Sequence, residues 1–276
     1  MRLQTGWIDV PMGGKTCAAY RARPAAPDGP LPAVLLVQEI WGVNEFIRDV
    51  TERFATAGYL ALAPELYSVG ERPADLAPER IDAAKRLMDT MAPAGWGDPA
   101  ERQRAAAALP IGEREQVIAT LEALFTPRDP GTQVHVLRDG VRALLNDEEC
   151  DGRIGTVGWC MGGTYAGLLA CRERKLSAAV VFYGAAVPDE EAPSLDCPLL
   201  GFYGAEDTRI TAGVPAMAEA MRKAGKSFEH HVYAGAPHGF FNDTRPSYRV
   251  DAARDAWARS LAFLGRHLAP QIWSAV

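Results

Sequence analysis

One cysteine in this chain stands between glycines at the end of an apolar run. Gly158-Trp159-Cys160-Met161-Gly162 follows Ile154–Val157, and its spacing is that of a nucleophile elbow, G-x-S-x-G, with sulfur in place of oxygen. In that motif a strand ends in a strained turn, and a helix whose N–H groups favour a thiolate begins directly behind it. The motif predicts acyl transfer through a covalent intermediate on Cys160. Taken alone, it also fits a tight turn that carries a buried cysteine.

A nucleophile of this kind needs a base, and the base needs an acid that orients it. Asp207 follows the apolar run Leu199–Tyr203. His238 follows the apolar run Phe228–Tyr233 in the same way. Both are therefore expected beyond the carboxyl ends of strands, where open α/β sheets build their sites. Because the order nucleophile, acid, histidine is that of α/β-hydrolases, we predict a catalytic triad of Cys160, Asp207 and His238.

Neighbouring residues leave alternatives to this assignment. Glu206 is the immediate rival of Asp207, and a loop carboxylate also commonly caps a turn. For His238 the alternative is a solvated loop histidine. The remaining histidines are placed differently, because they fall within an expected strand or within helical segments: His135, His230, His231 and His267.

Acyl chemistry also needs N–H groups that stabilise an oxyanion. Met161, the residue after the nucleophile, supplies one candidate, and the loop after Ala33–Val37 should supply the second. This loop reads Gln38-Glu39-Ile40-Trp41-Gly42. A glutamate beside the elbow is unusual, and its structural alternative is a carboxylate that faces water and caps the helix expected near Glu45.

Apolar runs of strand length alternate with segments of helical character. Runs that are apolar throughout indicate a mostly parallel sheet covered on both faces. An antiparallel hairpin over Trp7–Tyr20, broken by Pro11-Met12-Gly13-Gly14, is expected before the first parallel unit. The expected strands are Ala33–Val37, Tyr59–Ala63, Ile154–Trp159, Ala178–Tyr183, Leu199–Tyr203 and Phe228–Tyr233, and the expected helices are Glu45–Ala57, Thr211–Ala224 and Tyr248–His267.

The stretch from about Pro73 to Asn146 departs from this alternation. It is rich in Ala, Arg, Glu and Leu and has no strand candidate, and Pro93–Pro99 divides it into helical pieces. We interpret residues 73–146 as a helical insertion over the sheet, either lid-like or simply a long helical connection. The whole chain, residues 1–276, is then expected to form a single α/β domain.

The composition is that of an ordinary globular protein, with 276 residues, 48% of them hydrophobic, and a formal net charge of −6. This charge and the lack of a basic run argue against a nucleic-acid or anionic-membrane partner. Five scattered cysteines without C-x-x-C spacing suit a reducing compartment better than a disulfide framework or a zinc site. The N-terminus lacks the apolar core of a signal peptide. We expect a cytoplasmic protein.

Five motifs are spread along most of the chain, apart from the middle insertion. They are Gln38-Glu39-Ile40-Trp41-Gly42, Ala63-Pro64-Glu65-Leu66-Tyr67, Gly158-Trp159-Cys160-Met161-Gly162-Gly163, Gly204-Ala205-Glu206-Asp207 and Pro237-His238-Gly239-Phe240-Phe241-Asn242. These motifs resemble those of the dienelactone hydrolase family and come in the family's order, and together they are highly specific.

The resemblance implies a single α/β-hydrolase domain that hydrolyses a small-molecule ester or lactone without metal or organic cofactor. It implies the triad already named, with Glu39 helping to control the ionisation of the thiol. It also implies that the N–H groups of Ile40 and Met161 form the oxyanion hole. The residues that we expect around the substrate are Trp41, Trp159, Phe240 and Asn242, with core packing as the alternative for at least one of the aromatic side chains.

Two positions depart from the family. Members that act on dienelactone hold the substrate carboxylate with two arginines, one of them four residues after the histidine, where this chain has Asn242. The other falls at Ile81, with Arg80 beside it. We therefore expect neutral esters or lactones, or larger substrates reached under the helical insertion, to be preferred over dienelactone, unless Arg80, Arg209 or Arg245 supplies the charge from another direction.

A second class of function fits the same fold: a non-catalytic or redox-sensing protein that uses Cys160 as a reactive thiol. The accompanying acid and base argue against it, because a sensor needs only a sulfur of low pKa. Ester turnover with a burst, against stoichiometric alkylation without turnover, separates the two functions.

Overall fold

The computed structural model describes residues 2–92 and 95–269. The chain opens with an antiparallel hairpin of β1 (Leu3–Met12) and β2 (Lys15–Pro24). Gly13 and Gly14 form its two-residue turn, with φ angles of +58° and +69°. These angles lie in the left-handed region that glycine adopts most readily, which suits a tight hairpin turn. The expected hairpin is therefore present, and it extends beyond its predicted bounds.

One 8-stranded sheet has the order β1-β2-β4-β3-β5-β6-β7-β8. The pairs β1–β2 and β2–β4 are antiparallel, and the later neighbours are parallel. The prediction of a mostly parallel sheet is confirmed, with strand bounds that shift by a few residues. The strands that follow the hairpin are β3 (Leu31–Val37), β4 (Leu60–Pro64), β5 (Cys150–Trp159), β6 (Leu176–Phe182), β7 (Leu199–Gly204) and β8 (Phe228–Tyr233).

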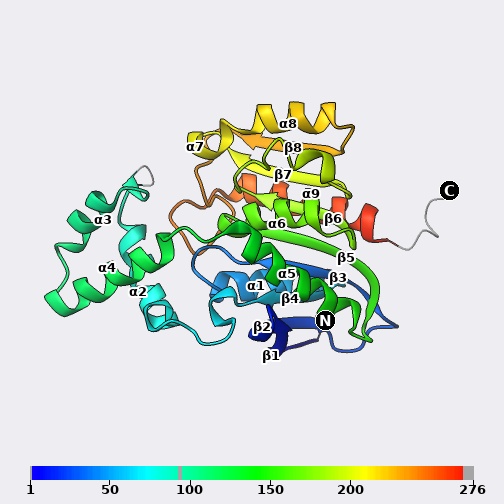
Figure 1. Ribbon diagram of the computed structural model, residues 1–276, viewed down its shortest axis with the longest axis horizontal. Helices are drawn as coiled ribbons and strands as arrows, with labels where there is room; N and C mark the ends of the chain where they lie inside the picture. Colours follow the sequence, from blue (N-terminus) through cyan, green and yellow to red (C-terminus); the bar gives the residue numbers. More distant parts are fainter. Residues whose placement is uncertain (1, 93–94, 270–276) are drawn as a thin grey trace.

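Helices cover both faces of this sheet (Figure 1). Along β3, Ala33, Leu35 and Val37 enter one apolar layer, whereas Val34 and Leu36 enter the other. This alternation follows because successive residues of a strand point to opposite faces. The first layer lies under α5 (Pro130–Leu145), α6 (Met161–Arg172) and α8 (Val214–Lys223), and the second lies under α1 (Glu45–Thr56) and α9 (Val250–Leu268).

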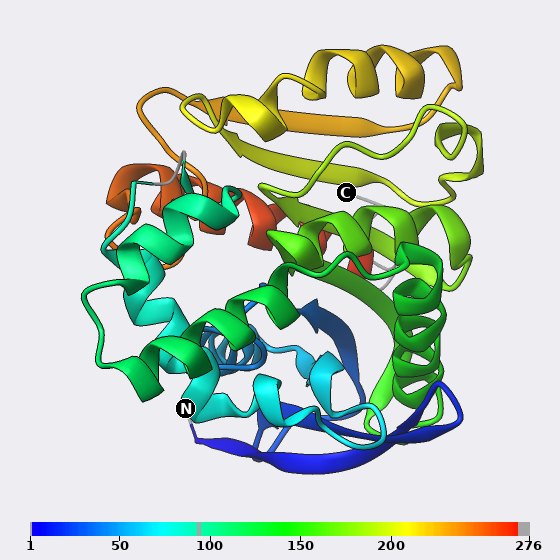
Figure 2. The ribbon, with the colours of Figure 1, turned by 60° about the vertical axis from the view of Figure 1, so that its left-hand side comes forward.

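Three helices stand apart at one end of the molecule (Figures 1 and 2). They are α2 (Pro78–Asp89), α3 (Pro99–Ala106) and α4 (Ile111–Phe125), and they share their own apolar cluster. Helix α5 also falls within the predicted insertion, yet it packs on α6, β1 and β5. The helical stretch therefore divides before α5. Its first part, here called the α2–α4 segment, stands beside the sheet, and its last part is a core helix.

One expected helix is interrupted. The sequence predicts a single helix over Thr211–Ala224, whereas the structure has α7 (Thr208–Thr211) and then α8. Gly213 precedes α8, and Pro215 lies in its first turn. Because proline has no N–H to donate, it fits the first turn of a helix but not the interior. The helix therefore begins again at this point.

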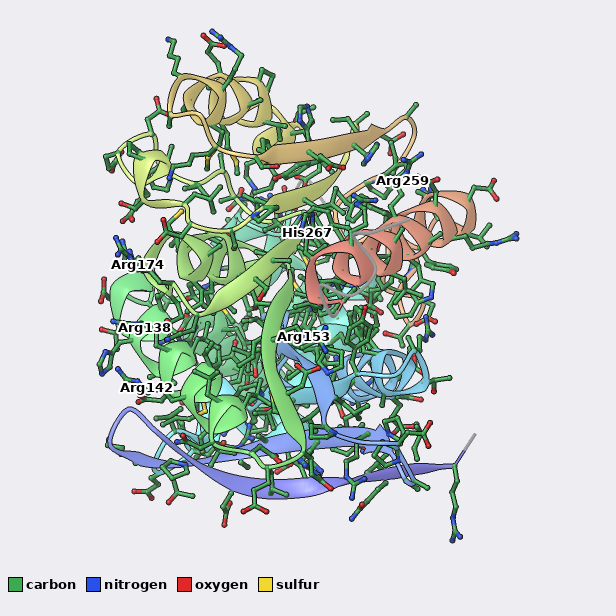
Figure 3. The ribbon with its side chains drawn as sticks, turned by 90° about the vertical axis from the view of Figure 1, so that its right-hand side faces the viewer. Arg138, Arg142, Arg153, Arg174, Arg259 and His267 are labelled. Atoms are coloured by element: carbon green, nitrogen blue, oxygen red, sulfur yellow. The ribbon has the colours of Figure 1, made fainter. Side chains whose placement is uncertain are left out.

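The side of the molecule opposite the α2–α4 segment carries several arginines (Figure 3). Each arginine labelled there contacts a carboxylate, so its positive charge is balanced locally. The pairs are Arg138–Glu173 at 3.0 Å, Arg142–Asp139 at 2.7 Å, Arg174–Asp196 at 3.0 Å, Arg259–Asp255 at 2.6 Å and Arg153–Asp151. Among the described residues, no helix has the length and apolar character needed to span a bilayer.

Candidate active site

Cys160 occupies the sharp turn between β5 and α6. Its φ of +56° and ψ of −119° lie outside the regions that residues with a side chain ordinarily adopt. A conformation of this kind costs about 1–3 kcal/mol and persists only where the surrounding structure holds it. The Cys160 N–H donates to the carbonyl oxygen of Phe182 at 3.0 Å. The turn thus has the form of the expected elbow, with a partly exposed thiol at the amino end of α6.

Two glycines make room for this turn. A Cβ added at Gly158 would come 2.0 Å from the carbonyl oxygen of Gly162, and one added at Gly162 would come 2.2 Å from that of Val37. Both contacts are with backbone, so a side chain at either position would force the chain apart. The second contact also shows that the end of β3 lies directly against the elbow. The loop that follows β3 is therefore held beside Cys160.

His238 and Asp207 lie at the same edge of the sheet and contact each other. His238 Nδ1 is 2.5 Å from Asp207 Oδ2, and the two side chains are 14% and 7% exposed. Asp207 follows β7 and precedes α7, whereas its rival Glu206 points to solvent. The structure therefore pairs His238 with Asp207, as the sequence predicts.

The pKa of His238 is raised to about 10. Burial by itself favours the neutral ring and lowers the pKa, but the negative charge of Cys160 and hydrogen bonds from the ring to Asp207 and Cys160 outweigh it. The imidazolium form of His238 is therefore favoured at neutral pH. In this form the ring can give a proton to a leaving group.

Glu39 is buried beside this pair, with a side chain that is 3% exposed. Its Oε1 accepts a hydrogen bond from the Tyr183 hydroxyl at 3.0 Å, and its Oε2 accepts one from Asn242 Nδ2 at 2.8 Å. The alternative of a water-facing carboxylate that caps α1 is wrong, because Asn44 caps that helix through its side chain.

Tyr183 is a site residue that sequence reasoning missed. It directly follows β6, and its φ of +40° is unusual for a residue with a side chain. Its ring packs edge-on against His238 with centroids 5.0 Å apart, while its hydroxyl donates to Glu39. Burial, together with the charge of Glu39, raises the pKa of Tyr183 well above its ordinary value. The hydroxyl therefore stays protonated and keeps its role as a donor.

Of the expected oxyanion-hole residues, Met161 directly follows Cys160, and Ile40 belongs to the loop that β3 holds beside the elbow. Met161 opens α6, where first-turn N–H groups have no intrahelical partner. The loop that carries Ile40 is fixed by two hydrogen bonds. The Tyr67 hydroxyl donates to the Ile40 carbonyl oxygen at 2.7 Å, and the Val43 N–H donates to Glu65 Oε2 at 2.9 Å.

The profile of the dienelactone hydrolase family matches residues 17–268. The chain belongs to the dienelactone hydrolase family. A "putative carboxymethylenebutenolidase" of Saccharolobus solfataricus is 36% identical over 252 residues, which cover 90% of this chain and 95% of the relative. A protein of the same name from Escherichia coli K12 is 34% identical over 274 residues, covering 95% of this chain and 87% of that protein. The resemblance noted in the sequence motifs is thus confirmed.

Solved structures agree with this membership. The structure titled "putative dienelactone hydrolase" from Klebsiella pneumoniae has a TM-score of 0.73 at 30% identity, over 96% of this chain and 100% of that chain. A dienelactone hydrolase-like promiscuous phosphotriesterase from metagenomic libraries, 19% identical, shares the fold with a TM-score of 0.69 over 98% of this chain and all of that one. The protein is a dienelactone hydrolase-like hydrolase with the α/β-hydrolase fold, as predicted.

Three of the residues expected around the substrate are buried in this structure. Trp159 is buried and stacks on Phe182 with centroids 5.4 Å apart. Phe240 is buried against Tyr183, with centroids 5.5 Å apart. Asn242 is also buried, and its amide is bonded to Glu39. Their positions at strand ends and in site loops predict that these residues lie near the site. The sequence does not predict whether each side chain points toward the substrate or into the core.

Trp41 lies at the border between the site loop and the α2–α4 segment. It is buried in the segment's apolar cluster, together with Ile81. It also lines a pocket of about 560 Å³ whose other walls come from β1, the start of α1 and α2. Cys160 and His238 are not among the residues that line this pocket. The side chain of Trp41 thus lies between this pocket and the apolar cluster of the α2–α4 segment. Its backbone belongs to the loop that is held beside Cys160.

The arginines considered as carboxylate ligands are differently engaged. Arg80 pairs with Asp75 at 2.8 Å and also donates to the Gln116 carbonyl oxygen at 3.2 Å. Arg245 is buried and pairs with Asp89. Arg209 lies exposed on α7, two residues after Asp207.

Proposed function

We propose that this family member hydrolyses carboxylic esters or lactones through a thioester on Cys160, with His238 as general acid and base and Asp207 as its orienting acid. The observation that carries the proposal is the strained elbow together with the 2.5 Å contact between His238 and Asp207. Relatives that bear the name carboxymethylenebutenolidase support the same reaction class.

In the proposed first step the Cys160 thiolate attacks the ester carbonyl carbon, and the N–H groups of Ile40 and Met161 stabilise the oxyanion. Collapse of this intermediate breaks the carbon–oxygen bond, and protonated His238 gives its proton to the leaving alkoxide. A thioester remains. Water then attacks the thioester while neutral His238 takes its proton, and the thiolate leaves. Asp207 stabilises the imidazolium form throughout the cycle.

Glu39 belongs to this mechanism as a second carboxylate that controls the charge on the sulfur. Both of its oxygens are held by the neutral donors Tyr183 and Asn242, so no cation compensates it within these contacts. A buried carboxylate held in this way can share the thiol proton with His238 before substrate binds.

We further propose neutral esters or lactones as the preferred substrates. Asn242 and Ile81 replace the two arginines of dienelactone-active relatives, and Asn242 is already committed to Glu39. Arg80 and Arg245 are paired with carboxylates.

The five free cysteines also support a reducing, cytoplasmic compartment, because the proposed nucleophile must remain reduced.

The proposal is tested with p-nitrophenyl acetate and the variant Cys160→Ala. We expect wild type to show a burst followed by turnover, and Cys160→Ala to show neither. Cys150→Ala is the matched control, because Cys150 is likewise partly exposed but lies at the start of β5, away from the elbow. Alkylation that maps to Cys160 without any turnover by wild type would favour a redox sensor, and an active Cys160→Ala protein would refute the mechanism.

A further inference from the structure

Arg245 lies seven residues after His238 and is buried between two tryptophans. Its guanidinium carbon is 5.1 Å from the ring centroid of Trp41 and 4.3 Å from that of Trp96. Trp41 belongs to the loop that carries Glu39 and Ile40, and Trp96 to the connection between α2 and α3. One side chain, 4% exposed, therefore contacts the histidine loop, the oxyanion loop and the α2–α4 segment at once.

The same guanidinium is paired with the last residue of α2. Arg245 Nε and Nη2 lie 2.8 and 2.7 Å from Asp89 Oδ1. Lys85 adds a second link, since its Nζ is 3.1 Å from Asp89 Oδ2 and 3.4 Å from the Thr244 carbonyl oxygen. The carboxyl end of α2 is thus fixed to residues 244–245 by two cations.

This link continues to the buried carboxylate of the site. Asn242 Oδ1 accepts hydrogen bonds from the N–H of Thr244 at 3.0 Å and from its hydroxyl at 2.7 Å. The amide nitrogen of Asn242 then donates to Glu39. The Arg245 N–H also donates to the Asn242 carbonyl oxygen at 3.2 Å. A continuous set of contacts therefore runs from Asp89 through Arg245 and Asn242 to Glu39.

The α2–α4 segment meets the elbow itself. Ile40 and Met161, the two expected oxyanion-hole residues, are partly buried against the segment's apolar cluster. The position of α2 therefore affects both the shape of the site and the loop that lines it.

We infer that Arg245 is a positioning residue for the reaction proposed above. Its pairing with Asp89 holds the α2–α4 segment against the elbow, and its stacking on Trp41 keeps the oxyanion loop in place. Arginine suits this role because its planar group can stack and bond in its own plane at the same time, which lysine cannot do. A buried pair of this kind needs both partners, because removing one leaves an uncompensated charge.

The decisive experiment is a double-mutant cycle with Asp89→Asn and Arg245→Gln. Each single variant should lower kcat/KM for p-nitrophenyl acetate about tenfold or more. The double variant should lose much less than the product of the two single losses, since either change alone already breaks the Arg245–Asp89 contact. Alkylation of Cys160 by a bulky maleimide should accelerate relative to alkylation by iodoacetamide, because the segment no longer sits closely against the elbow. Asp89→Glu should restore part of the wild-type behaviour.

The matched control is Glu101→Gln, which removes an exposed ion pair with Arg104 on α3 of the same segment. It should leave kcat/KM and the ratio of alkylation rates unchanged. Thermal unfolding of each variant verifies that it is folded. If Arg245→Gln does not fold, the comparison of Asp89→Asn with Asp89→Glu tests the inference by itself. Wild-type behaviour of Asp89→Asn would overturn the inference.

A different outcome would assign Arg245 to substrate binding. In that case Arg245→Gln would lose activity only toward esters that carry a free carboxylate, while Asp89→Asn, which frees the guanidinium, would keep or gain it. That result would also overturn the inference. Failure of the proposed function is distinguishable from these outcomes, because it would appear as ester turnover by Cys160→Ala.

Discussion

Glu39 presents the sharpest chemical question at the level of single residues. Its carboxylate is buried within the contacts of two neutral donors, Tyr183 and Asn242, and Tyr183 also packs on the ring of His238. A glutamine at this position has nearly the same shape but carries no charge and can accept through only one of its two terminal atoms. Comparing Glu and Gln therefore separates the charge of this residue from its packing.

We expect Glu39→Gln to lower kcat by ~10²–10⁴-fold and to change the pH profile near neutrality, because acid–base partners contribute on this scale. The measurement is the pH dependence of ester hydrolysis, together with the rate of Cys160 alkylation. Glu206→Gln is the control, since Glu206 is an exposed carboxylate beside Asp207. An unchanged profile with normal kcat would give Glu39 a purely structural role.

His238 leads to a prediction at alkaline pH. Its pKa of about 10 reflects burial, which lowers it, and the stronger opposing effects of Cys160 and Asp207, which raise it. The imidazolium needed to protonate a leaving alkoxide therefore persists below this pH and is lost above it. Hydrolysis of an alkyl ester should fall as pH rises through 10, whereas a p-nitrophenyl ester, whose leaving group needs no proton, should be affected less.

In Asp207→Asn one of the effects that raise the pKa of His238 is removed. The rate of alkyl-ester hydrolysis should therefore begin to fall at a lower pH than in wild type. The ratio of alkyl-ester to p-nitrophenyl-ester rates, measured across the range, reports this shift. If the rate of alkyl-ester hydrolysis falls at the same pH as in wild type, the carboxylate of Asp207 does not stabilise the imidazolium, and the role proposed for it is wrong.

At the scale of elements, the close approach of the elbow to β3 depends on Gly162. An added Cβ would lie 2.2 Å from the Val37 carbonyl oxygen, which cannot move without shifting the loop that carries Glu39 and Ile40. Gly162→Ala should therefore lower kcat/KM by about 10² or more, the usual cost of losing an oxyanion donor. Ester hydrolysis and thermal unfolding measure the effect.

Gly265→Ala provides the contrasting substitution, because this exposed glycine of α9 has open space around its added Cβ. Alanine in a helix is favoured over glycine by about 0.5–1 kcal/mol, so this variant should be slightly more stable and fully active. Equal activity of the Gly162 and Gly265 variants would mean that the elbow tolerates a side chain that its geometry excludes.

The elements were largely predictable because their signals are local. Apolar runs and the order of Cys160, Asp207 and His238 along the chain placed three side chains at one edge of the sheet. The orientation of buried side chains was not predictable, because it depends on partners far away in sequence. Asn242 donates to a carboxylate 203 positions earlier, and Phe240 packs on Tyr183. Tyr183 itself directly follows a strand, and that position was a usable signal.

The helical stretch shows the same limit. Helix α5 and the α2–α4 segment both lie in a stretch with helical character and no strand candidate, so the sequence groups them into one insertion. What separates them is the surface that each apolar face meets. α5 contributes Val134, Leu137 and Val141 to a sheet layer, whereas α2 and α4 turn toward each other. The local sequence of a helix does not predict which surface its apolar face will pack against.

At the scale of the whole molecule, charge and shape bear on substrate choice. The formal net charge is −6, and Arg80 and Arg245 are both engaged by carboxylates. An anionic substrate therefore meets a negative protein and gains no charge from these two arginines. A charge-assisted hydrogen bond contributes roughly 1.5–3 kcal/mol, so the absence of two of them lowers kcat/KM for a carboxylate substrate by ~10²–10⁴-fold.

We therefore expect a neutral lactone, or the methyl ester of dienelactone, to be hydrolysed with a higher kcat/KM than dienelactone itself. Added salt should narrow this difference only slightly, because screening weakens the long-range repulsion but supplies no local donor. Arg209→Gln is the informative companion variant, since Arg209 is exposed on α7 just after Asp207. A strong preference for the free carboxylate would contradict the prediction, and its loss in Arg209→Gln would identify that guanidinium as the group that replaces the two missing arginines.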